Sequence, residues 1–213
     1  MPKKSKHRSV ILQEHRGDRL TDRKRCAILQ AAVQEFQSKG FYSASMNGIA
    51  EVASVSKRTL YNHFESKEAL FDAMVQELLS RAKLLPNADF DPSRDLAEQL
   101  TELAESEVEF ITSDAVIALA RACMSRVLAE PDVGKQVDQR QFQHRIENWI
   151  RQAQEAGYLI ESDCEIVAAQ FSGLLKTFAI WHAILQGEPR PSRKKKRQIA
   201  ATTVAMILSQ YQA

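Results

Sequence analysis

Residues 57–63 gather polar side chains that are able to do chemistry. Arg and Asn match the edges of guanine and adenine, the Thr methyl group suits thymine, and Lys, Tyr and His suit phosphates. Tyr61 and His63 could also act as an acid/base pair, but no carboxylate or nucleophile is placed with them. An ordinary solvated helix face is the remaining alternative. The cluster consists of Lys57, Arg58, Thr59, Tyr61, Asn62 and His63.

The residues around this cluster predict two short helices joined by a tight turn. Ser45 and Ser56 each stand where a hydroxyl can cap the start of a helix. Leu60 and Phe64 are four residues apart, so both point to one core and the polar residues between them face outward. This pattern predicts a helix-turn-helix, which lays its second helix in the DNA major groove.

Most of the remaining sequence has helical periodicity, and no stretch alternates convincingly as a strand. We therefore predict an all-α protein, with an N-terminal three-helix helix-turn-helix head and a C-terminal helical bundle. Gly40 is expected in a left-handed conformation at the end of the first long helix. The longer helices are expected over about 21–39, 66–85, 93–111, 114–130, 132–156, 163–186 and 192–211.

The predicted domains are a flexible basic arm over 1–20, a DNA-binding domain over 21–66 and a ligand-binding and dimerisation domain over 67–213. Residues 86–93 have the composition of a linker. Residues 1–67 carry 13 Lys and Arg against 6 Asp and Glu, whereas residues 68–213 carry 16 against 21. A basic first third suggests that this end of the chain meets a polyanion. The arm itself either reaches the minor groove or is simply disordered.

Composition excludes several other classes of protein. No apolar run approaches a membrane span and no signal-peptide core is present, so we expect a cytoplasmic protein with no membrane partner. Cys26, Cys123 and Cys164 are widely spaced, which argues against a disulfide framework or zinc knuckle. His144 and His182 lack metal-ligand spacing. We expect no metal, no cofactor and no catalytic residues.

The run IAEVASVSKRTLYNHFESKEALF, preceded by FYSASM, closely resembles the N-terminal signature of the TetR family of bacterial transcriptional repressors. The resemblance covers about residues 21–71. It implies a DNA-binding head of three helices, followed by a variable helical domain that dimerises through its last two long helices and usually binds a small molecule. AAQFSGLLKTFAIW, residues 168–181, looks more weakly like the dimerisation helix of AcrR-type members.

The resemblance also implies roles for individual residues. By position, Lys57, Arg58 and Thr59 fall where the family reads bases. Where the family binds phosphates, this sequence has Tyr61, His63 and Lys67, and near the DNA backbone it has Ser45 and Met46. The family usually has Gly at the position of Ser54, so a positive φ there would be costly for this chain.

Several side chains of the second domain are candidates for the lining of a ligand pocket, although helical spacing makes core packing the default for most of them. They are Phe110, Cys123, Met124, Trp149, Phe171, Phe178 and Trp181. These aromatic residues, and the lack of clustered basic residues before Arg190, favour a small hydrophobic effector. The homodimer is expected to form through helices 163–186 and 192–211.

Together these features predict a homodimeric repressor that binds a palindromic operator and is released by a small hydrophobic ligand. The alternative is a DNA-binding regulator with no small-molecule effector, controlled by a protein partner or by thiol oxidation. A helical enzyme is a third possibility, but no nucleophile–base pair, phosphate loop or metal cluster supports it.

Overall fold

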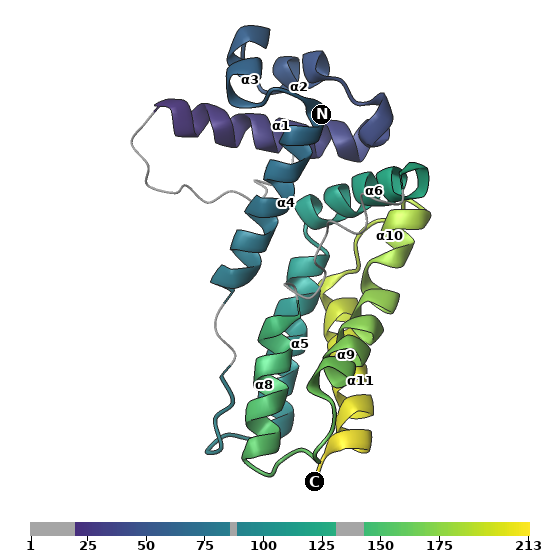
Figure 1. Cartoon of the computed structure of the whole chain (residues 1–213). Helices are drawn as coiled ribbons and strands as arrows, with labels where there is room; N and C mark the ends of the chain where they lie inside the picture. The colour runs from purple at the N-terminus through teal and green to yellow at the C-terminus, as the bar shows by residue number, and fades with distance from the viewer. Residues whose placement is uncertain (1–19, 86–88, 131–142) are drawn as a thin grey trace, which may run out of the picture. The chain divides into compact units, whose positions relative to one another are not determined.

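The computed structural model describes residues 20–85, 89–130 and 143–213, and in these ranges every regular element is a helix (Figure 1). An isolated antiparallel bridge between Leu159 and Gln212 is the one exception among the described residues. The all-α prediction is confirmed. Contacts divide the chain into two compact units: α1, α2, α3, the beginning of α4 and α6 form the first, and α5 and α8 to α11 form the second.

The first helix of the first unit, α1 (Leu20–Ser43), has the boundary that the sequence predicts. Gly40 interrupts it with a φ of 73°, so the regular helix ends there and a short turn follows. This conformation is left-handed and favours glycine. Ile28, Ala32 and Phe36 are fully buried and form the apolar face of this helix.

Three further helices surround α1: α2 (Met46–Val52), α3 (Lys57–His63) and the beginning of α4 (Lys67–Leu84). Their shared core holds three aromatic rings, since Phe41 lies 5.5 Å from both Phe36 and Phe71. Leu60 of α3 packs into the same unit with no exposed surface. The core thus fixes the direction in which α3 presents its polar face.

The helix α6 (Asp114–Ala129) also belongs to the first unit, and it packs along α1. Arg126 of α6 is buried, and its guanidinium lies 4.7 Å and 4.9 Å from the ring centroids of Phe41 and Phe71. Tyr42 adds a hydrogen bond from its hydroxyl to Glu130. Nothing in the local sequence predicts this long-range packing.

The second unit contains the remaining helices: α5 (Leu96–Ile111), α8 (His144–Glu155), α9 (Cys164–Ala179), α10 (Trp181–Leu185) and α11 (Arg193–Tyr211). The expected helix over 132–156 is confirmed from His144 onward, and residues 131–142 lie outside the described ranges, as does the basic arm. A single helix over 163–186 is wrong, because Ile180 leaves helical geometry, with φ −120° and ψ −34°, and separates α9 from α10.

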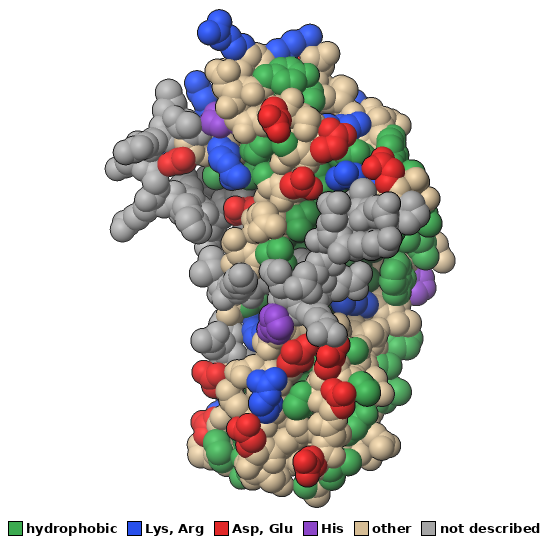
Figure 2. All heavy atoms as spheres, in the orientation of Figure 1, with side chains coloured by type: hydrophobic (Ala, Val, Ile, Leu, Met, Phe, Trp, Pro, Cys, Tyr) green, Lys and Arg blue, Asp and Glu red, His purple; other side chains and the backbone are tan. Residues whose placement is uncertain are grey.

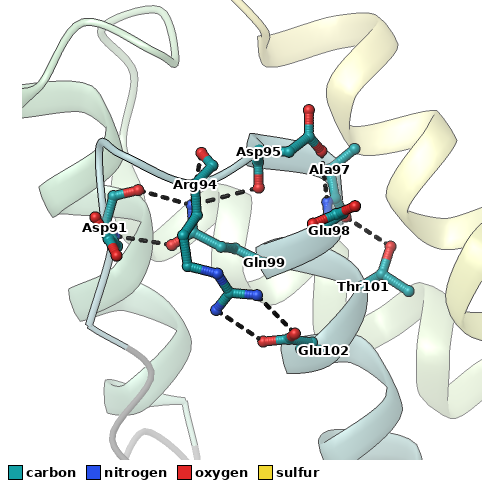
Figure 3. A network of polar contacts seen from close by, with 8 residues as sticks. All are labelled: Asp91, Arg94, Asp95, Ala97, Glu98, Gln99, Thr101 and Glu102. Atoms are coloured by element: carbon teal, nitrogen blue, oxygen red, sulfur yellow. Dashed lines mark hydrogen bonds and ion pairs between the residues drawn. The ribbon is translucent and has the colours of Figure 1, made fainter.

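The helix α5 begins at Leu96, three residues later than predicted, because a polar network occupies the preceding turn (Figure 3). Asp95 caps the helix by accepting a hydrogen bond from the Glu98 backbone N–H at 2.8 Å. The buried side chain of Gln99 accepts from the Asp91 N–H and donates to the Asp91 carbonyl, and Arg94 pairs with Glu102 through two hydrogen bonds. These contacts fold residues 91–95 into a turn rather than a helix.

Candidate nucleic-acid interface

The predicted caps and turn of the helix-turn-helix are present. The hydroxyl of Ser45 accepts a hydrogen bond from the Gly48 N–H at 3.0 Å, and that of Ser56 accepts from the Thr59 N–H at 3.1 Å. Between the helices, Ser54 has a φ of 54°, and it is the one non-glycine residue with positive φ in the described ranges. The turn therefore has the backbone that favours glycine, but this chain builds it with serine.

The outward face of α3 carries the polar cluster that the sequence singles out. Leu60 and Phe64 are buried, and they hold one side of the helix in the core. On the other side Lys57, Arg58, Tyr61 and Asn62 are exposed, whereas Thr59 and His63 are half-buried. Figure 2 shows Lys and Arg side chains projecting from the surface over α3. The four exposed side chains of α3 are therefore accessible to a ligand.

The hydroxyl of Thr59 is engaged within the helix, because its Oγ1 lies 2.9 Å from the Ser56 Oγ. The Thr59 side chain also carries a methyl group that can make an apolar contact with a base. That methyl group matches the apolar contact expected with thymine.

Lys67 opens α4 and ties it to the segment before α2. Its ammonium donates hydrogen bonds to the carbonyl oxygens of Tyr42, at 3.2 Å, and Ala44, at 3.1 Å. It also lies 4.7 Å from the centroid of the Phe41 ring. An ammonium has three N–H groups, so one remains for a further acceptor.

Two residues that the sequence does not single out support the N-terminus of α2. The carboxylate of the buried Glu35 accepts hydrogen bonds from Lys39, at 2.8 Å, and from the Ser45 N–H, at 3.5 Å. A Cβ at Gly48 would lie 2.4 Å from the Glu35 Oε1, so a larger residue here would require the Glu35 carboxylate to move. The sequence carries one sign of this role for Glu35: a carboxylate stands among the apolar residues of the first helix, next to Phe36.

The proposed ligand-lining residues fall in both units. Cys123 and Met124 belong to α6 of the first unit, and both are half-buried. In the second unit Phe110 is half-buried, and Trp149 and Phe171 are buried. Phe178 and Trp181 are instead 52% and 41% exposed, as expected of a contact surface rather than of a pocket lining.

No group of three or more His, Cys, Asp and Glu side chains is arranged to hold a metal ion within 20–85, 89–130 and 143–213. In the same part of the chain, no helix combines the length and hydropathy needed to cross a bilayer.

Comparison with known families covers most of the sequence. Residues 28–74 match the bacterial regulatory proteins of the tetR family, and residues 98–213 match the C-terminal domain of AefR-like transcriptional repressors. The first match contains the helix-turn-helix. The second begins in α5 and includes α6 and α8 to α11.

Individual relatives agree with these matches. A TetR family regulator from Pseudomonas syringae pv. tomato is 35% identical, with 91% of this chain and 99% of that chain covered and a TM-score of 0.76. The flavonoid-responsive regulator FrrA is 26% identical, with 90% and 98% covered and a TM-score of 0.62.

The transcriptional regulator UidR of Escherichia coli K12 is 47% identical over 58 residues, which is 27% of this chain and 30% of UidR. The chain therefore matches less than a third of the length of this curated relative. The 35% identity along nearly the whole P. syringae protein, together with the two family matches, supports a broader conclusion. The chain belongs to the TetR family of transcriptional regulators, and it is a DNA-binding regulator rather than an enzyme.

Proposed function

We propose that this protein is a repressor that binds a near-palindromic operator as a homodimer. The observation that carries the proposal is the outward face of α3, which presents Lys57, Arg58 and Tyr61 while Leu60 anchors the helix. Arg suits guanine edges, and Lys and Tyr suit phosphates. The match of residues 98–213 to AefR-like repressors supports repression over activation.

The proposed DNA contacts divide into base-reading and backbone-binding groups. Lys57, Arg58 and Thr59 lie in the first turn of α3 and would read bases. The groups that would bind the phosphate backbone are Ser45, Met46, Tyr61, His63 and Lys67. For Lys67 this role uses the N–H that is left after its two carbonyl bonds.

The proposed dimer interface is the exposed apolar surface of α9, α10 and α11. Figure 2 shows hydrophobic side chains along the edge over these helices. The exposed large side chains are Ile166, Phe178, Trp181, Leu185 and Met206. Contiguous apolar surface of this kind marks an interaction site, and a two-fold axis would pair it with itself. Leu175 and Ile207 of the same helices are buried in the protomer and would not contribute.

A small hydrophobic ligand is proposed to release the operator. The aromatic side chains of the second unit support this, and so does the similarity to a regulator described as flavonoid-responsive. A ligand can shift the spacing of the two recognition helices only if it binds one dimer geometry better than the other.

Selection of operators from random duplexes by the purified protein tests this function. Two-fold symmetric sites are expected, with half-sites about 34–36 Å apart or a multiple of that spacing. Recovery of asymmetric sites alone would contradict the dimeric mode of binding. A ligand screen on the operator complex then tests release.

A further inference from the structure

Three charged side chains meet inside the second unit, where α9 packs against both α5 and α8 (Figure 1). Glu107 comes from α5, Arg145 from α8 and Lys176 from α9. The Arg145 guanidinium pairs with the Glu107 carboxylate at 3.0 Å, and these side chains are only 14% and 9% exposed. Arg145 also donates a hydrogen bond to the Ser106 hydroxyl.

Lys176 has no comparable partner. Its side chain is half-buried, and among the described residues no hydrogen bond or ion pair involves its ammonium. Burial lowers the pKa of Lys176, and the charge of Glu107 opposes this shift only in part. Burial likewise raises the pKa of Glu107, against the charges of Arg145 and Lys176.

The Glu107 carboxylate is not available as a direct partner of the Lys176 ammonium. Two cations surround a single carboxylate, and that carboxylate is already paired with Arg145. A partly desolvated cation without a partner is unfavourable, and an anion placed beside it would remove that cost. The cluster therefore suits a ligand with one negative charge.

Aromatic residues lie one helical turn from two members of the cluster. Phe110 follows Glu107 by one turn on α5, and Trp149 follows Arg145 by one turn on α8. Residues three or four apart share a helix face, so Glu107 and Arg145 each have an aromatic residue on the same face of their own helix. On α9, Leu175 is buried next to Lys176.

We propose that the effector is an amphipathic organic acid whose carboxylate binds the Lys176 ammonium and whose apolar part lies against Phe110 and Trp149. This deepens the effector half of the proposed function and rests on it. It also refines the class of ligand, because a purely hydrophobic compound would leave the charge of Lys176 unpaired.

Pairs of acids and their uncharged amides test the proposal on the full-length protein by calorimetry. Suitable pairs are 2-naphthoate with 2-naphthamide, 3-phenylpropanoate with its amide, and decanoate with decanamide. At least one acid should bind about 10- to 100-fold more tightly than its amide, as a charge-assisted hydrogen bond provides. K176Q should abolish this preference, whereas K176R, which keeps the charge, should retain it.

A second readout uses the unmodified protein, in case K176Q does not fold. The preferred acid, but not its amide, should protect Lys176 from acetylation by acetic anhydride, as followed by mass spectrometry. The proposal is overturned if no acid binds better than its amide, if K176Q keeps the preference, or if Lys176 is not protected.

Titrations with operator DNA, run in parallel, distinguish failure of the acid site from failure of the proposed operator-binding function. If the acid binds through Lys176 and operator affinity does not change, the acid site stands and its role as the effector site fails. If the protein selects no operator even without an acid, the proposed function fails independently of the acid site.

Discussion

The ammonium of Lys67 donates a 3.1 Å hydrogen bond to the carbonyl oxygen of Ala44, the residue before the cap of α2. The same ammonium bonds to the Tyr42 carbonyl and lies over the Phe41 ring. Lys67 therefore holds the start of α4 against the segment that leads into the helix-turn-helix. A phosphate bound by its third N–H would be fixed in position by these contacts.

Lys67→Ala should weaken binding to operator and to scrambled DNA alike, because a phosphate contact carries no sequence information. The slope of log affinity against log salt should become shallower by about one for each lost contact, so about two for a dimer. Titrations at several salt concentrations measure both effects. Thermal melting should also show a less stable protein, since two carbonyl oxygens lose their donor. A change in base preference would contradict the role proposed for Lys67.

Arg58→Ala should cost about 1–3 kcal/mol on the preferred operator and relax the choice of base at one position in each half-site. Arg58 is exposed in the first turn of α3, where its planar guanidinium can reach a guanine edge. Arg58→Lys is the matched control, because lysine keeps the positive charge but lacks the planar guanidinium that can form two parallel hydrogen bonds. It should bind scrambled DNA as the unmodified protein does and still lose base preference. If base preference is unchanged in both variants, Arg58 does not contact a base, and the turn at Ser54 orients α3 differently from the proposed pose.

Ser54→Gly should stabilise the protein by about 1 kcal/mol, since Ser54 has a φ of 54°. Ser56→Ala is the opposing comparison, because it removes the hydroxyl that caps α3 and should destabilise by about 1 kcal/mol. Urea unfolding of both variants measures these changes. If Ser54→Gly leaves the unfolding midpoint unchanged or lowers it, the left-handed serine is not strained.

Local sequence signals predicted most of the fold. Ser45, Ser56 and Gly40 mark helix ends through interactions within a few residues, so each boundary could be read from the sequence. The break at Ile180 could not be predicted, because no glycine or proline stands there. Periodicity also could not tell Leu175 in the core from Phe178 on the surface, since both extend the same apolar helix.

The sites were predictable to different degrees. The polar face of α3 follows from two apolar residues on the same helix, Leu60 and Phe64. The cluster of Glu107, Arg145 and Lys176 depends on how three helices pack, and no single segment contains a sign of it. The contact of Glu35 with Gly48 joins two helices and was missed for the same reason.

Phe178→Glu combined with Trp181→Glu should yield monomers in sedimentation. Both side chains are exposed in the protomer, so the substitutions should spare its core. In the proposed dimer each glutamate would be buried without a partner, which costs several kcal/mol. Leu128→Glu is the control, because Leu128 is an exposed apolar residue of α6, outside the proposed interface. An unaltered dimer in the double variant would place the interface elsewhere.

Cys123 should react slowly with iodoacetamide, and its slow reaction would count against regulation by oxidation of this thiol. Burial raises the pKa of the Cys123 thiol to about 11, although the nearby charge of Arg126 lowers it in part. At pH 8 about one molecule in a thousand would then carry the reactive thiolate. Cys26 is exposed on α1 and serves as the internal reference. Mass spectrometry of the alkylated protein should show Cys26 modified well before Cys123. The opposite order, with Cys123 modified first, would point to a reactive thiol. If mild oxidation then releases the operator from the unmodified protein but not from a Cys123→Ser variant, the protein is controlled by thiol oxidation and not by a ligand.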